Sequence, residues 1–120
     1  MAGSTISARE GIIRELFARL SAGNPDVAEL YHENATIRRR MEPVVTGREA
    51  IRRFYLGVVA DTSPDVEIVD FISDERRVAA LLRATTTGGV QRRAVDVFEV
   101  DEDGIHSLEI YSDGQPLTPA

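Results

Sequence analysis

Acid–base chemistry is the kind of catalysis that this sequence is equipped to perform. Asp96 stands in the alternating segment 94–98 (AVDVF), so in a strand it shares one face with Phe98. A carboxyl group on an apolar face is costly unless it is paired or protonated, and desolvation then raises its pKa. Such a group can act as a general acid, a general base or a donor to an oxyanion. The alternative is that Asp96 is one half of a structural ion pair with Arg83.

An arginine triplet at 38–40 is the second group with chemical potential. Alternation in a strand places Arg39 on the same face as Ile37 and Met41, and its two arginine neighbours on the opposite face. On the inner face of a pocket, Arg39 could bind a carboxylate, a phosphate or an enolate. The alternative is an arginine whose stem packs on the protein while its guanidinium stays in solvent at the rim.

One histidine and two tyrosines complete the candidates. His106 is expected on the same face as Asp96, where it could act as a base; the alternative is a structural histidine beside a turn. His32 is expected at the surface or as a capping residue. Tyr31 and Tyr55 are expected in the core, each with one hydrogen-bonded hydroxyl.

The composition excludes several other chemistries. The 120 residues include no Cys and no Lys, which rules out thiol nucleophiles, thiolate metal sites and Schiff-base lysines. Two histidines cannot form a three-histidine zinc site, and neither stands in a metal-binding motif. No glycine-rich phosphate loop is present. We therefore expect an activity that needs no cofactor and no metal.

The charge of the chain bears on its partners. The net charge of −6 and the pI near 4.9 argue against nucleic acid as a partner. The sequence has no basic amphipathic helix and no apolar run long enough to span a membrane, so no membrane partner is expected. Residues 1–6 lack the charged and apolar regions of a signal peptide, and a cytoplasmic location is expected.

Capping and periodicity patterns predict one α+β domain over residues 1–120, with its core at about 7–113. The S-x-x-E pattern at Ser7 and the T-x-x-E pattern at Thr46 begin two helices, and Gly23 ends the first of them. Asn24 and Pro25 begin a short helix between these two. Strands are expected at 35–41, 66–73, 77–87, 90–101 and 105–111. A curved antiparallel sheet packed by three helices leaves a ligand pocket at its open end.

The turns predict which side chains share the inner face. A two-residue loop at 88–89 pairs Leu81 with Asp96, and a three-residue loop at 102–104 pairs Asp96 with Ile110. A competing two-residue turn would place Asp96 opposite Tyr111 and reverse the faces of the last strand. The preferred register gives an inner face of Leu81, Arg83, Asp96, Phe98, Val100, His106, Leu108 and Ile110. The valines of the opposite face suggest a homodimer through the sheet.

Three segments carry a resemblance to a known family. The segments are 16–37 (LFARLSAGNPDVAELYHENATI), 45–55 (VTGREAIRRFY) and 94–113 (AVDVFEVDEDGIHSLEIYSD). Together they resemble the nuclear transport factor 2-like superfamily, in particular its SnoaL-like and ketosteroid isomerase-like group. The resemblance implies a cone-shaped fold that encloses a pocket. It says little about chemistry, because the superfamily includes isomerases, cyclases, epoxide hydrolases and non-catalytic binding domains.

The resemblance to ketosteroid isomerases implies which residues of this chain stand at the places of their functional groups. The place of their catalytic base falls on Arg39, and the place of their main tyrosine donor falls on Leu16. Their second donor, an acid, aligns with Asp96, and their supporting tyrosines align with Tyr31 and Tyr55. An arginine stays protonated and cannot serve as a base, so steroid isomerisation by that mechanism is not expected.

A second template within the resemblance is limonene epoxide hydrolase. That enzyme type uses an arginine between two aspartates, and the arginine aligns with Arg83. The two aspartates align with Thr85 and Ile110, which cannot replace them. An acid-base mechanism in this chain would therefore have to depend on other groups.

Two functional hypotheses follow. The first is a cofactor-independent isomerase, cyclase or epoxide hydrolase with Asp96, Arg39 and Arg83 as catalytic residues. The second is a non-catalytic ligand-binding or assembly domain of the same fold. In both, a small hydrophobic or anionic organic molecule is the expected ligand. Its binding residues are expected to be Leu16, Tyr31, Phe54, Tyr55, Phe98, His106, Leu108 and Ile110.

Overall fold

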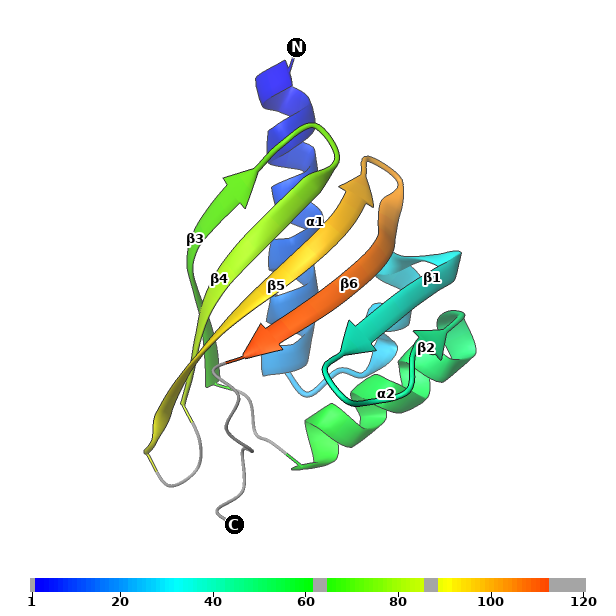
Figure 1. The fold of residues 1–120 in the computed structure, drawn as a ribbon, viewed down its shortest axis with the longest axis vertical. Coiled ribbons are helices and arrows are strands. Elements are labelled where there is room, and N and C mark those ends of the chain that lie inside the picture. The colour runs from blue at the N-terminus through cyan, green and yellow to red at the C-terminus, as the bar shows by residue number, and fades with distance from the viewer. Residues whose placement is uncertain (1, 62–64, 86–88, 113–120) are drawn as a thin grey trace.

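Two helices, a 3₁₀ helix and a six-stranded sheet make up the computed structural model (Figure 1), which describes residues 2–61, 65–85 and 89–112. The sheet order is β2-β1-β6-β5-β4-β3, antiparallel except for the parallel pair of β1 and β6. The elements are α1 (Ala2–Ser21), η1 (Asp26–Leu30), β1 (Tyr31–Arg39), β2 (Val45–Thr46), α2 (Arg48–Asp61), β3 (Asp65–Ser73), β4 (Arg77–Thr85), β5 (Gln91–Asp101) and β6 (Gly104–Ser112).

The sheet is curved, and α1 crosses the face that we call the inner face (Figure 1). The helix α2 lies beside β1 and β2 at one end of the sheet, while no helix of the described residues covers the opposite, outer face. This arrangement confirms the predicted α+β fold with a curved sheet. In the described parts of the chain, no helix is both long and apolar enough to cross a membrane.

The first helix ends as predicted but begins earlier. Gly23 has a φ of 74°, its N–H donates to the Leu20 carbonyl, and the Asn24 N–H donates to the Arg19 carbonyl, which is a Schellman ending. At the other end, α1 already begins at Ala2, so the predicted start at Ser7 is wrong. Glu10 does not close a capping box; its carboxylate accepts a hydrogen bond from Ser73 at 3.1 Å.

The other two predicted helices also differ in detail. The short one is the 3₁₀ helix η1, preceded by Asn24, whose side-chain oxygen accepts the Asp26 N–H at 2.9 Å. The third is α2, which begins at Arg48; the Gly47 carbonyl accepts the first helical bond, from Ile51. The predicted helix start at Thr46 is therefore displaced by one residue to Gly47, which has no side chain for a capping box and holds a positive φ of 89° that favours glycine.

The first strand ends two residues before the predicted boundary. The structure places β1 at Tyr31–Arg39, and Met41 follows in a turn with a φ of 66° and 91% exposure. Met41 therefore does not share the inner face with Ile37, as alternation had predicted. The predicted end of the 77–87 strand at Thr87 lies outside the described residues.

The register of β4 against β5 differs from the prediction by one residue. Asp96 pairs with Ala80 instead of Leu81, and Arg83 pairs with Arg93 instead of Ala94. Thr85 pairs with Gln91 instead of Arg92, so five residues separate the paired positions, one fewer than the predicted pairing requires. A slip of one residue moves every side chain of a strand to the opposite face of the sheet. Leu81 and Arg83 consequently lie on the outer face.

The register of β5 against β6 is the preferred one. Asp96 pairs with Ile110 and Phe98 with Leu108, which rules out the pairing with Tyr111. The turn is shorter than predicted, because Asp101 pairs with Gly104, and a bulge at His106 restores the alignment. His106 is thereby left out of the ladder and is exposed, so its predicted place on the inner face is wrong.

The core lies between α1, η1 and the inner face. It includes the helical stripe at Ile13, Leu16, Phe17 and Leu20, and each of these side chains is at most 8% exposed. Its sheet side consists of alternating residues of β1, β4, β5 and β6, namely Ala35, Ile37, Val78, Ala80, Leu82, Phe98, Val100, Ile105 and Leu108. One charged side chain of β5, Asp96, belongs to this buried face.

Candidate functional site: a buried carboxyl group on the inner face

The candidate site is one cross-strand row of the inner face. Arg39 pairs with Ile110, Ile110 with Asp96, Asp96 with Ala80, and Ala80 with Phe71. Directly opposed residues share a face, so this row runs from β1 to β3 with Asp96 near its middle. The tertiary structure thus brings Arg39 and Asp96 onto the same face, two strands apart.

Asp96 is a buried acid without a partner. Its side chain is 7% exposed, and within the part of the chain that the structure describes no hydrogen bond or ion pair reaches its carboxyl group. Burial raises the pKa of Asp96 from 3.8 to about 7, because desolvation disfavours the charged form. The group is therefore close to half-protonated at neutral pH, which suits a general acid or base. The alternative ion pair with Arg83 is wrong.

A tyrosine pair lies close to this acid. The hydroxyls of Tyr31 and Tyr55 are 2.6 Å apart, and both side chains are at most 4% exposed. Burial raises the pKa of both tyrosines, and the charge of Asp96 raises them further. Both hydroxyls therefore stay protonated and can donate hydrogen bonds. The predicted core position of these tyrosines, each with a hydrogen-bonded hydroxyl, is confirmed.

Aromatic contacts connect this pair with Arg39 at the rim. The guanidinium carbon of Arg39 lies 4.8 Å from the ring centroid of Phe54, and the Phe54 ring meets Tyr55 edge-on at 5.0 Å. Arg39 itself is exposed. Its strand position belongs to the inner face while its charge stays in solvent, which is the rim position predicted as the alternative.

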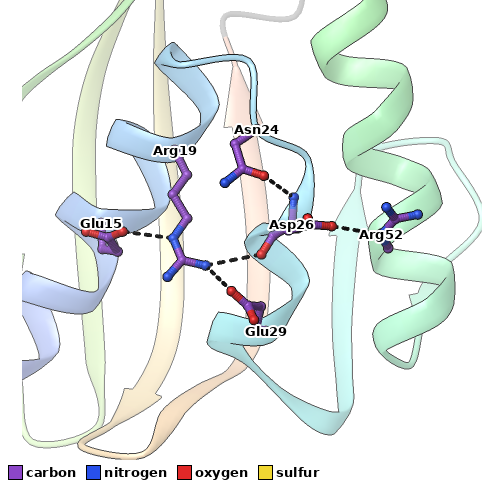
Figure 2. Close-up of polar contacts among 6 residues, drawn as sticks. All are labelled: Glu15, Arg19, Asn24, Asp26, Glu29 and Arg52. Carbon is purple, nitrogen blue, oxygen red and sulfur yellow. Dashed lines mark hydrogen bonds and ion pairs between the residues drawn. The ribbon is translucent and has the colours of Figure 1, made fainter.

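An ion-pair network joins the helical elements around the tyrosines. Arg19 of α1 bonds Glu15 at 2.8 Å and Glu29 of η1 at 2.6 Å, and Arg52 of α2 bonds Asp26 of η1 at 3.0 Å (Figure 2). Tyr31 follows η1 directly, and Tyr55 lies one turn after Arg52 on α2. Exposed pairs contribute little individually, but this set spans the three elements that position the two tyrosines.

Most of the predicted site residues lie in or against the core, but Arg39, Arg83 and His106 do not. Leu16, Phe98 and Leu108 are buried with the tyrosines, while Phe54 and Ile110 are partly buried beside them. Arg83 lies on the outer face, where its guanidinium pairs with Glu67 at 3.1 Å. His106 lies near the start of β6, and its side chain is 42% exposed.

Asp96 lines neither of two surface concavities formed by the described residues. One, of about 290 Å³, is lined by Arg9, Glu75, Val100, Asp101, Glu102 and Asp103. The other, of about 280 Å³, lies between α1 and β3 and is lined by Arg14, Phe17, Ala18, Ser21, Val66 and Ile68. The pocket predicted at the open end of the sheet is therefore neither of these two.

Arg9 is a buried charge that the sequence reasoning missed. It is 2% exposed, and its Nη2 donates to the Asp74 carbonyl at 2.7 Å. Its Nε and Nη1 have no partner among the described residues. The signal was present, since Arg9 precedes Ile13 and Leu16 at helical spacing and so belongs to the apolar stripe of α1.

The fold is that of a curved-sheet α+β domain of the nuclear transport factor 2-like type. The family model for the SnoaL-like domain matches residues 13–107, so the chain belongs to the SnoaL-like family. A comparison with curated protein sequences gave no significant match.

Among solved structures, the chain is similar to the epoxide hydrolase/cyclase-like enzyme SalBIII, which has a role in pyran ring formation in the polyether salinomycin. The identity is 26%, the TM-score is 0.76, and the alignment covers 88% of this chain and 91% of that one. A putative SnoaL-like polyketide cyclase from Jannaschia sp. CCS1 is 15% identical, with a TM-score of 0.77 and coverage of 89% and 86%. A de novo designed protein with a curved β-sheet is 16% identical, with a TM-score of 0.80 and coverage of 90% and 87%. At these lower identities, the last two show only the fold.

Proposed function

We propose that this protein is a cofactor-independent acid–base enzyme that closes or opens an oxygen-containing ring in a small organic molecule. The observation that carries the proposal is the carboxyl group of Asp96, which is buried, has no partner among the described residues and is raised in pKa to about 7. The similarity to SalBIII supports the class of cyclases and epoxide hydrolases over isomerases.

In the proposed reaction, protonated Asp96 donates its proton to the epoxide oxygen as the carbon–oxygen bond breaks. A hydroxyl group of the same substrate, or a water molecule, attacks the carbon at which that bond breaks. The proton that the attacking oxygen loses returns to the Asp96 carboxylate, so the acid is regenerated and no cofactor is consumed. A group with a pKa near the working pH is suited to both steps.

The neighbouring groups have supporting roles in this proposal. The Tyr31–Tyr55 pair, held by its 2.6 Å contact, keeps neutral donors close to the acid and adds no competing charge. Arg39 at the rim attracts an anionic group of the substrate. Arg83 has no role, because it lies on the outer face and pairs with Glu67.

The test is turnover of a panel of alkyl epoxides and epoxy-alcohols, followed by mass spectrometry of the diol or cyclic ether products. The Asp96→Asn variant should lose about 10²–10⁴-fold in kcat, the usual contribution of a general acid or base. Glu99→Gln is the matched control, since Glu99 belongs to the same strand and the outer face. Circular dichroism checks that both variants are folded.

The outcome separates the enzyme from a binding domain. Turnover that survives Asp96→Asn would remove this acid from the mechanism. Saturable binding of panel members without turnover by the wild-type chain would favour a non-catalytic ligand-binding domain. That alternative is motivated by Arg39 and Leu16, which stand where the ketosteroid isomerase resemblance implies a base and a donor.

We also propose that a second copy of the chain covers the outer face. Leu81, Val95 and Val97 are only partly buried there, and Tyr111 is 54% exposed on the same face. A contiguous apolar patch of this kind is typical of an interface. Native mass spectrometry should show a dimer that Val97→Arg converts to a monomer. A wild-type chain that is monomeric at micromolar concentration would contradict this proposal.

A further inference from the structure

Two histidines and an aspartate converge at the end of the sheet where β5 turns into β6. The Nε2 atom of His32 lies 3.2 Å from Oδ1 of Asp101, and the Nε2 atom of His106 lies 2.5 Å from Oδ2 of the same carboxylate. The two imidazole rings are stacked, with centroids 3.7 Å apart and an angle of 10° between their planes. Three strands, β1, β5 and β6, thus contribute one side chain each.

Local backbone irregularities create this convergence. The bulge at His106 takes this residue out of both neighbouring ladders, and β1 is also irregular between Tyr31 and Thr36. Gly104 allows the turn to approach η1 closely, since a Cβ at this position would lie 2.8 Å from the Leu30 carbonyl oxygen. His32 is thereby brought beside the turn that carries Asp101.

The turn holds Asp101 in a defined orientation. Oδ1 of Asp101 accepts the backbone N–H groups of Asp103 at 2.8 Å and Gly104 at 3.0 Å. The carboxylate is therefore oriented by backbone donors, as ligands of metal ions commonly are.

The ligand set and its geometry suit a transition metal ion. One atom from each residue can be chosen so that the three lie within 4.8 Å of one another. Ligands of one zinc ion lie about 2.0–2.2 Å from it, so rotations of the side chains would bring the three atoms to bonding distance. These rotations are accessible, because the side chains are 32% (His32), 49% (Asp101) and 42% (His106) exposed.

We propose that His32, Asp101 and His106 form a binding site for a divalent first-row transition ion, with zinc and nickel as the preferred candidates. Imidazole and carboxylate ligands together favour such ions over magnesium or calcium, which prefer all-oxygen sets. Three protein ligands leave one or more coordination positions for water. The ion fastens β1 to the β5–β6 turn, and the site is independent of the function proposed for Asp96.

The competing explanation is a hydrogen-bonded His–Asp–His cluster without affinity for metal. Glutamine variants separate the two, because Gln retains an N–H that can donate to Asp101 but is a poor zinc ligand. His32→Gln and His106→Gln should thus preserve the fold and lose the metal. Both positions are surface positions, so misfolding is not expected to hide the result.

The experiment is isothermal titration of Zn²⁺ and Ni²⁺ into chelator-treated, full-length protein without a histidine tag. The wild-type chain should bind one ion per chain, with a rise in Tm on saturation. Loss of an outer-shell partner alone typically costs about 10–100-fold in metal affinity, so His32→Gln, His106→Gln and Asp101→Asn should each cost at least about tenfold. Asp70→Asn, a carboxylate on the distant edge strand β3, is the matched control and should bind as the wild type does.

Two results would overturn the inference. One is a wild-type chain with no saturable binding of either ion below millimolar concentration. The other is stoichiometric binding that the two glutamine variants leave unchanged, which would place the ion elsewhere on the chain. A Tm that rises with zinc in the wild type but not in His106→Gln would support the site by a second readout.

Discussion

Strand β5 carries two aspartates, Asp96 and Asp101, whose environments drive their protonation in opposite directions. Asp96 is surrounded by the core and has no partner among the described residues, and burial raises its pKa to about 7. Asp101 lies at the end of the strand, where hydrogen bonds to two histidines and two backbone N–H groups outweigh its partial burial and lower its pKa. The comparison teaches that residue type and strand do not determine the chemistry of a carboxyl group. Desolvation and hydrogen bonding do.

The largest expected effect comes from removing the buried charge. At pH 8, Asp96→Asn should raise the free energy of unfolding by up to about 4 kcal/mol, because a pKa raised from 3.8 to about 7 corresponds to about 1.4 kcal/mol per unit. The folded state binds the proton more tightly than the unfolded state does. The contribution of Asp96 to wild-type stability is therefore most favourable below about pH 4, and it declines as the pH rises towards about 7.

Urea unfolding at pH 4.5, 6 and 8 measures this effect. The difference between Asp96→Asn and the wild type should grow with pH and then level off above about pH 7. A difference that does not vary with pH would mean that Asp96 titrates normally, and the contrast with Asp101 would disappear.

The next effect concerns the tyrosine pair beside the acid. Tyr55→Phe leaves the Tyr31 hydroxyl buried without its 2.6 Å partner, which should cost about 1–3 kcal/mol of unfolding free energy. Tyr111→Phe is the matched control, because the Tyr111 hydroxyl bonds Glu109 at an exposed position, and it should change stability by less than about 0.5 kcal/mol. Equal losses in the two variants would contradict the buried role of the pair.

A smaller effect, with the opposite dependence on pH, is expected at the turn. Asp101→Asn should destabilise the chain at pH 7 by about 1 kcal/mol or less, since solvent screens a half-exposed carboxylate. Because the pKa of Asp101 is lowered in the folded state, its carboxylate stabilises that state at pH values above the ordinary pKa of 3.8. This contribution is lost as the pH falls below 3.8.

Acid titration of stability distinguishes the two aspartates. In metal-free protein, the cost of Asp101→Asn should shrink on acidification from pH 7 to pH 3, whereas the effect of Asp96→Asn should grow with pH. If the cost of Asp101→Asn does not vary with pH, the hydrogen bonds to His32 and His106 do not lower the pKa of Asp101.

The smallest effect is expected at the rim. Arg39→Met keeps the aliphatic stem but loses the cation over the Phe54 ring, a contact worth about 0.5–1 kcal/mol at exposed sites. Arg38→Met, at an exposed neighbouring position on the opposite face of β1, is the control. If Arg39 also attracts substrate, its substitution should raise KM for an anionic epoxide and leave kcat nearly unchanged. A change confined to kcat would place its role at the reacting atoms instead.

Part of the site could be predicted because it depends on local periodicity. Alternation along β5 and β6 was sufficient to place Asp96 opposite Ile110 and Phe98 opposite Leu108. The error at Arg83 arose from the connection between β4 and β5, where one residue fewer than predicted separates the paired positions and reverses the faces of β4. The error at His106 arose from a bulge, which no periodic pattern in the sequence reveals.

The sequence by itself determined the α+β class, the acid on the inner face of β5 and the absence of lysine and cysteine chemistry. These follow from composition and from the period-two geometry of a strand, which are properties of neighbouring residues. Only the tertiary structure decided that Arg39 joins the row of Asp96 and that His32, Asp101 and His106 meet at one turn. Such contacts join residues up to 74 positions apart (32 to 106), and they depend on the register and bulges of paired strands.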